Sequence, residues 1–202
     1  MIPALYGFAK ALATIYTRVL SPMTVEGLEN VPADGSVMLC CNHISMMDPV
    51  ELVAVVKRPV RFMAKEELFR SPFTKWLFGG LGAIPVKRGE NDLSSVRECL
   101  KLLREGAIVG VFLQGTRNAE GLFDAAKRKP MLTGAALIAL KGNADIVPVL
   151  FPRKFRAFRR NVLCFGKPIP IAEYRGKADA QTLKTIMRRA EDAIWSMQDT
   201  ES

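Results

Sequence analysis

The feature that most constrains the fold is the alternation of short apolar runs with segments of helical periodicity along the chain. This alternation is typical of α/β proteins, in which helices cover the strands of a largely parallel sheet. The run within 36–41 is apolar almost throughout and predicts a strand that is buried on both faces. We therefore expect a single α/β domain with a mixed, largely parallel sheet flanked by helices.

Strands are predicted at 23–27, 36–41, 60–64, 83–86, 107–113, 146–150 and 162–165. Helices are predicted at 2–20, 48–57, 66–81, 130–141 and 179–197. The helix at 66–81 is interrupted at Ser71-Pro72. A further helix is predicted, capped by Asn91 or Asp92 and ending at Gly106.

The length of 202 residues allows one domain with an appendage rather than two full domains. We place the appendage at 1–22 and the domain at 23–202. Residues 2–20 are mostly apolar, but Lys10 and Arg18 divide them into pieces too short to cross a membrane. No basic region precedes them, which argues against an export signal. They predict an amphipathic helix that lies either on the protein's own core or at a membrane interface.

The charge and the missing motifs limit the function classes. Lysine and arginine number 29 against 20 acidic residues, a net charge of +9, which favours anionic partners such as phosphorylated metabolites, anionic lipids or nucleic acid. The four cysteines have no metal-ligand spacing and there is one histidine, so no disulfide framework, metal or cofactor is expected. The usual serine-hydrolase, P-loop and zinc-protease motifs are missing.

The single histidine, His43, stands five residues before Asp48 in a loop that directly follows a predicted strand. Loops at strand ends are where α/β proteins place reactive groups. A carboxylate on one imidazole nitrogen fixes the tautomer and stabilises the imidazolium that forms when the other nitrogen takes a proton. The pair predicts a general base, His43, oriented by Asp48. Without any chemistry, Asp48 is explained as a helix N-cap, with Pro49 and the capping glutamate Glu51 behind it.

Two further loops combine cations with glycine at predicted strand ends: Val86-Lys87-Arg88-Gly89 and Gly115-Thr116-Arg117. Guanidinium groups bind phosphate oxygens in pairs, glycine lets backbone N–H groups approach, and threonine adds a hydroxyl donor. Either loop taken alone is also explained as a solvated turn. Because parallel strands bring their carboxyl ends to one edge, we expect both loops to share an edge of the sheet with His43 and to bind a phosphate.

Four blocks, in this order, resemble those of the glycerolipid acyltransferases, especially the bacterial 1-acyl-sn-glycerol-3-phosphate acyltransferases. They are NHxxxxD at 42–48, GxxPVxR at 82–88, a variant of FPEGTR at 112–117 and VPV at 147–149. The resemblance implies that His43 deprotonates the sn-2 hydroxyl of a lysophosphatidate (lysophosphatidic acid), that Asp48 supports His43, and that no acyl-enzyme forms. The hydroxyl attacks the thioester of acyl-CoA or of an acyl carrier protein and gives phosphatidic acid for phospholipid biosynthesis.

The resemblance also implies that Arg88, Gln114, Gly115, Thr116 and Arg117 bind the substrate. Gln114 departs from the family pattern, which has glutamate there, and Leu113 stands where the family has proline. The glutamine carbonyl still accepts a hydrogen bond, so we expect the change to be tolerated.

The stretch 151–160 carries five cations and three phenylalanines. It suits an anionic membrane, a single-stranded nucleic acid, or a solvated pair of strands. A lipid substrate favours the membrane, so we expect a peripheral or monotopic protein on the cytoplasmic face of the cell membrane, with no nucleic-acid partner. The alternatives are an acyltransferase for another lysophospholipid, a non-catalytic lipid-binding relative and a nucleic-acid-binding protein.

Overall fold

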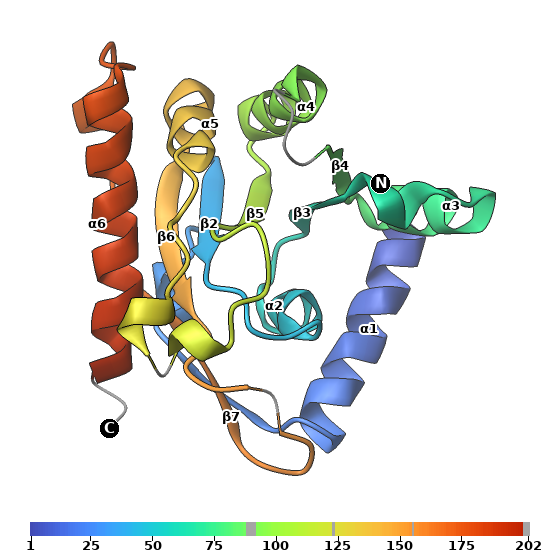
Figure 1. Ribbon diagram of the computed structural model, residues 1–202. Helices are drawn as coiled ribbons and strands as arrows, with labels where there is room; N and C mark the ends of the chain where they lie inside the picture. Colours follow the sequence, from blue (N-terminus) through green and yellow to red (C-terminus); the bar gives the residue numbers. More distant parts are fainter. Residues whose placement is uncertain (88–91, 123, 155, 200–202) are drawn as a thin grey trace.

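The computed structural model describes residues 1–87, 92–122, 124–154 and 156–199, and it confirms the predicted α/β architecture (Figure 1). The strands are β1 (Met23–Glu26), β2 (Val37–Cys41), β3 (Val60–Lys65), β4 (Ile84–Val86), β5 (Ile108–Phe112), β6 (Asp145–Leu150) and β7 (Asn161–Phe165). The helices are α1 (Pro3–Val19), α2 (Asp48–Val55), α3 (Pro72–Leu81), α4 (Leu93–Arg104), α5 (Gly134–Gly142) and α6 (Ala180–Asp199).

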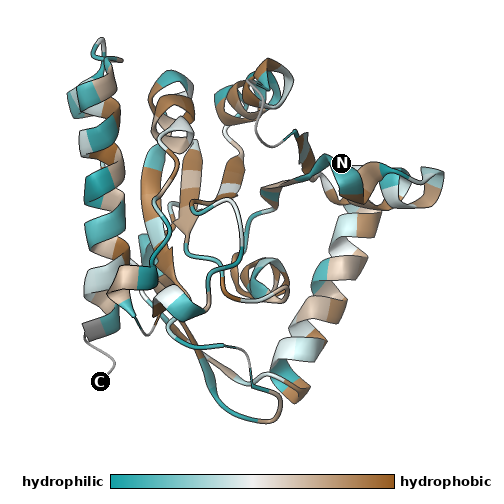
Figure 2. Cartoon of the chain, in the orientation of Figure 1, coloured by the Kyte–Doolittle hydropathy of each residue, from teal (hydrophilic) through white to brown (hydrophobic). Residues whose placement is uncertain are grey.

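The strands form one seven-stranded sheet in the order β1-β7-β6-β2-β5-β3-β4. All the paired strands are parallel except β6 and β7, which makes the sheet mixed and largely parallel as predicted. All five residues of β2 are buried, since β2 lies between β6 and β5 with helices on either side. Figure 2 shows hydrophobic residues concentrated on these central strands. Because the pairs among β6, β2, β5, β3 and β4 are parallel, the carboxyl ends of these strands share one edge of the sheet.

The helices lie in two groups on either side of the strands (Figure 1). In one group α5 packs against both α4 and α6, and in the other α1 packs against α2 and α3. Asp92 caps α4 as predicted, because its carboxylate accepts hydrogen bonds from the backbone N–H groups of Ser94 and Ser95. Asn91, the alternative cap, lies outside the described residues.

Two helix boundaries differ from the prediction. The helix expected at 130–141 begins at Gly134, since the backbone N–H of Leu132 is bonded to the carbonyl of Leu113 and keeps this segment extended beside the end of β5. The helix expected at 48–57 ends at Val55, because the side chain of Lys10 binds the backbone carbonyls that follow. The ammonium group of Lys10 donates to the carbonyls of Val56 and Lys57, at 2.7 Å each.

The N-terminal helix α1 packs on the protein with its more polar side. Tyr6, Ala13 and Thr17 are its buried residues, and the Tyr6 hydroxyl accepts a hydrogen bond from the backbone N–H of Val60 at 2.9 Å. The side chains of the opposite side are exposed and apolar: Phe8, Leu12, Ile15 and Val19, which we call the outward stripe. Such an orientation reverses the usual one, in which the apolar side of a surface helix faces the core. None of the helices among the described residues is long and apolar enough to cross a bilayer.

Candidate active site

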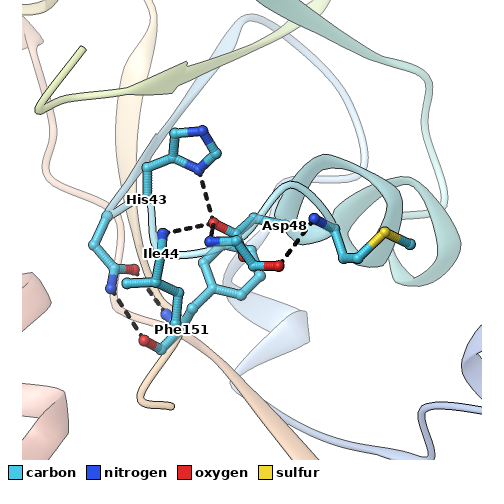
Figure 3. Close-up of polar contacts among 7 residues, drawn as sticks. His43, Ile44, Asp48 and Phe151 are labelled. Atoms are coloured by element: carbon cyan, nitrogen blue, oxygen red, sulfur yellow. Dashed lines mark hydrogen bonds and ion pairs between the residues drawn. The ribbon is translucent and has the colours of Figure 1, made fainter. Parts of the chain in front are cut away.

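The loop that follows β2 is folded around the carboxylate of Asp48. Its Oδ2 atom accepts hydrogen bonds from the backbone N–H groups of Ile44 and Ser45 at 2.8 and 2.9 Å, and it lies 2.8 Å from His43 Nδ1 (Figure 3). The predicted contact between His43 and Asp48 is therefore present. The side chain of Asp48 is 2% exposed, so this contact is protected from water.

The predicted N-cap role of Asp48 is wrong. Asp48 is the first residue of α2, Met47 occupies the N-cap position, and no side chain caps the helix. The reason is that the carboxylate is turned back to the preceding loop, away from the first N–H groups of the helix. Glu51 is not the predicted capping residue either, because its carboxylate accepts a hydrogen bond from the hydroxyl of Ser21.

The imidazole of His43 is held from two sides. Asp48 lies at Nδ1, and the ring of Phe112, from the end of β5, stacks on it with 4.1 Å between centroids and 26° between planes. We assign the neutral-state proton to Nδ1, since that nitrogen faces a carboxylate. Nε2 then carries the free lone pair, and 16% of the His43 side chain is exposed to solvent. This geometry suits a general base.

Two asparagines fix the backbone around His43. The side-chain amide of Asn42, which is fully buried, donates to the carbonyl of Phe151 at 3.0 Å and accepts from its N–H at 2.8 Å (Figure 3). The backbone N–H of Asn118 donates to the carbonyl of His43 at 2.7 Å. The His43 loop is thus held to the end of β6 on one side and to the loop after β5 on the other.

The loop after β5 places Gln114 to Arg117 beside the His43 loop, because β5 pairs directly with β2. Gly115 has a φ of 63°, which favours glycine at this turn. Gln114 is 6% exposed, and its Nε2 donates to the carbonyl of Lys129 at 3.5 Å. Its Oε1 is buried and has no hydrogen-bond partner in the described part of the chain. Arg117 is exposed, and Thr116 is partly buried.

The second predicted phosphate loop follows β4 at the same edge of the sheet. Arg88 and Gly89 lie outside the described residues. Lys87 is exposed, and its backbone N–H donates to Asp92 Oδ2 at 2.9 Å. The Ser94 hydroxyl and this N–H hold the pKa of Asp92 well below its usual range. Because β4 is three positions from β2 in the sheet, about 14 Å of strand spacing separates the end of β4 from the end of β2 that precedes His43.

Comparison with known proteins decides the family. Residues 22–151, well over half of the chain, match the model of the family described as Acyltransferase. The chain belongs to the acyltransferase family. The match includes the His43 loop, the loop after β4 and the loop after β5.

Relatives agree with this assignment, and a solved structure agrees with the fold. The acyltransferase is 32% identical over 148 residues to the 1-acyl-sn-glycerol-3-phosphate acyltransferase of Bacillus subtilis (strain 168), which covers 73% of this chain and 71% of that protein. It is 32% identical over 141 residues to the protein of the same name from Borreliella burgdorferi, covering 69% of this chain and 54% of the relative. The crystal structure of the 1-acyl-sn-glycerophosphate acyltransferase PlsC from Thermotoga maritima matches 99% of this chain and 79% of its own with a TM-score of 0.68, and at 24% identity it supports the fold.

The contacts of three residues around His43 in this acyltransferase were not anticipated from the sequence: Asn42, Phe112 and Asn118. Asn42 and Phe112 each begin one of the blocks that resemble the family, and Phe112 lies near the end of the strand predicted at 107–113. The bonds of Asn42 to Phe151 and of Asn118 to His43 had no local signal, because each joins residues that lie far apart along the chain.

Proposed function

We propose that the acyltransferase transfers a fatty acyl group from acyl-CoA or acyl carrier protein to the sn-2 hydroxyl of 1-acylglycerol-3-phosphate, giving phosphatidic acid. The observation that carries this proposal is the 2.8 Å contact between His43 Nδ1 and the buried carboxylate of Asp48 at the carboxyl edge of the sheet. The names of the Bacillus and Borreliella relatives support the choice of acceptor.

The proposed reaction is a single displacement, which the contact between His43 and Asp48 supports. His43 Nε2 takes the proton of the sn-2 hydroxyl while the hydroxyl oxygen bonds to the thioester carbon. Asp48 stabilises the imidazolium that forms, since its carboxylate lies at Nδ1. The carbon–sulfur bond then breaks, and the proton passes from Nε2 to the departing thiolate. Both substrates are bound together, and no residue of the protein is acylated.

The substrate phosphate is assigned to the loops after β5 and β4. Gly115 and Thr116 offer backbone and hydroxyl donors, and the guanidinium groups of Arg117 and Arg88 offer charge. Arg117, one strand away from His43, forms no ion pair or hydrogen bond with other residues that the structure describes, so its guanidinium is free for a ligand.

The assay that tests the function incubates the detergent-solubilised protein with lysophosphatidate and either acyl-CoA or acylated carrier protein, and follows phosphatidate by mass spectrometry. We expect product with at least one donor. Lysophosphatidylcholine and lysophosphatidylethanolamine serve as alternative acceptors. If one of these were acylated in preference to lysophosphatidate, it would be the acceptor instead. No product with any combination of donor and acceptor would favour the non-catalytic lipid-binding alternative.

Gln114 is proposed to accept a hydrogen bond from a hydroxyl of the substrate. Its buried Oε1, without a protein partner among the described residues, is the supporting observation. Since an amide carbonyl and a carboxylate both accept, Gln114→Glu is expected to change kcat/KM by less than tenfold. Gln114→Leu removes the acceptor and is expected to lower kcat/KM by about tenfold or more. A gain of tenfold or more in Gln114→Glu would show instead that the glutamine impairs the site.

We also propose that 1–22 is the membrane-associating segment of a peripheral or monotopic enzyme on the cytoplasmic face of the cell membrane. Two neighbouring features support this. The outward stripe exposes four large apolar side chains, between 51% and 63% exposed. The basic turn, residues 156–160, is joined to the end of α1, because the backbone N–H of Phe158 donates to the carbonyl of Leu20 at 2.7 Å. Phe158 is 75% exposed, and its φ of 59° is rare for phenylalanine.

Charge reversal in the basic turn is expected to weaken binding to an anionic membrane. Each cation near such a surface contributes about 1 kcal/mol, so Arg159→Glu with Arg160→Glu should reduce binding to phosphatidylglycerol-containing vesicles by about 30-fold or more. The measurement is vesicle sedimentation at low and high salt. The matched control reverses Lys184 and Arg188 on α6, which carries no outward apolar stripe, and should reduce binding less. Equal binding by the wild type and the basic-turn variant would contradict the membrane assignment of this turn.

A further inference from the structure

A second carboxyl group lies buried one helical turn from Asp48 on α2. Glu51 is 3% exposed, and its Oε1 accepts a hydrogen bond from the Ser21 hydroxyl at 3.4 Å. Ser21 is fully buried and in turn accepts a hydrogen bond from the Asn161 side chain at 2.9 Å. No lysine or arginine among the described residues forms an ion pair with Glu51. The proposed reaction does not use this carboxyl, and its burial requires an explanation.

The hydrogen bonds continue from Asn161 to the surface. The Asn161 side chain accepts from the backbone N–H of Arg156 at 3.0 Å and donates to the carbonyls of Arg156 and Arg159 at 3.1 and 2.9 Å. Its backbone N–H donates to the carbonyl of Pro22 at 2.7 Å. A continuous set of bonds therefore joins the basic turn, the end of α1 and the first turn of α2.

The charges around Glu51 leave it close to balance between its neutral and ionised forms. Burial, together with the negative charge of Asp48 on the same helix and against the opposing effect of the Ser21 hydroxyl, raises the pKa of Glu51 to about 7. On α1, burial and the charge of Glu51 raise the pKa of Tyr16 to about 12. On β2, burial raises the pKa of the Cys41 thiol, with the charge of Asp48 contributing. The ammonium group of Lys10 lies at the opposite end of α2.

We propose that Glu51 is a positioning residue for the acyltransfer reaction, which acts through Asp48 by setting the negative charge that His43 faces when it accepts a proton. The inference rests on the proposed role of His43 as the base. Residues three apart on a helix are neighbours on its surface, so an ionised Glu51 adds a second negative charge behind Asp48. In a partly buried site such a charge acts at close range with little screening. The ionised form of Glu51 favours the imidazolium, and its neutral form favours the free base.

The test uses the fact that the chain contains one histidine. In protein labelled at histidine, one imidazole signal reports the titration of His43 by NMR and requires no turnover. Glu51→Gln keeps the size and the acceptor but not the charge, and is expected to lower the titration midpoint of this signal by about half to one pH unit. Ser21→Ala removes the donor that favours ionised Glu51, and should move the midpoint in the same direction by less.

The matched control is Glu105→Gln, which removes the same charge at an exposed position next to the amino end of β5, the opposite edge of the sheet. It should leave the midpoint unchanged.

Identical midpoints for the wild type and Glu51→Gln, in folded protein, would overturn the inference. In the phosphatidate assay, the acid limb of kcat/KM should move to lower pH by the same amount, with KM for lysophosphatidate unchanged. If Glu51→Gln shifted the midpoint of the imidazole signal but the wild-type protein made no phosphatidate, the proposed function would be refuted and the coupling between Glu51 and His43 would be kept.

Discussion

Replacing His43 with alanine is expected to lower kcat for phosphatidate formation by about 10³-fold, because the substrate hydroxyl then has no base to take its proton. KM for lysophosphatidate should change little, since the proposed phosphate site, in the loops after β5 and β4, does not include the imidazole. The measurement is steady-state kinetics with the donor that gives product for the wild type.

The fold of the His43→Ala variant should be kept, because Asn42 and Asn118 hold this loop through bonds that do not involve the imidazole. Met46→Ala is the matched control, since Met46 lies in the same loop and is 69% exposed. Its kcat should stay within a few-fold of the wild-type value. A His43→Ala enzyme that retains a tenth or more of the wild-type kcat would eliminate His43 as the base.

Asp48→Asn is expected to reduce kcat by 10²-fold or more with a smaller effect on stability. The asparagine carbonyl oxygen can still accept the hydrogen bonds of Ile44 and Ser45, but a neutral amide does not stabilise an imidazolium. Kinetics and thermal unfolding, measured on the same preparation, separate the two effects.

Asp48→Ala provides the contrast. It leaves the two backbone N–H groups without their acceptor, and each unsatisfied buried donor costs about 1 to 3 kcal/mol. This variant should therefore unfold at a lower temperature than Asp48→Asn. If Asp48→Asn turned over at the wild-type rate, the carboxylate would serve only to fold the loop.

The strands and the His43–Asp48 contact were predictable because their signals are local. A buried strand such as β2 is marked by its own apolar run, and the five-residue spacing of His43 and Asp48 allows the ring to turn back onto the carboxylate. The shared edge of β2, β5 and β4, from which the two proposed phosphate loops follow, was predictable from parallel pairing, a general property of α/β sheets.

The features that could not be predicted depend on contacts between distant residues. Asp48 has the sequence pattern of an N-cap, and only the folded loop shows its carboxylate bonded to residues before the helix. The delayed start of α5 results from the bond between Leu132 and Leu113. Glu51 has the sequence position of a capping residue, and its bond to Ser21 spans 30 residues. Which side of α1 faces the protein was also left open, because Lys10 finds its partners more than 40 residues away.

The way α1 is attached has a practical consequence for shortened forms of this enzyme. Its Lys10 ammonium satisfies two carbonyls after α2, its Tyr6 hydroxyl accepts from the first residue of β3, and the backbone N–H of Ile2 donates to the carbonyl of Gly80. Deleting the first 20 residues would remove these partners and uncover the side of α2 that α1 covers. If such a shortened protein failed to bind vesicles, the cause could therefore be unfolding as readily as the loss of the membrane-binding segment. Substitutions confined to the outward stripe separate the two, because they change the side chains proposed to face lipid and leave these contacts in place.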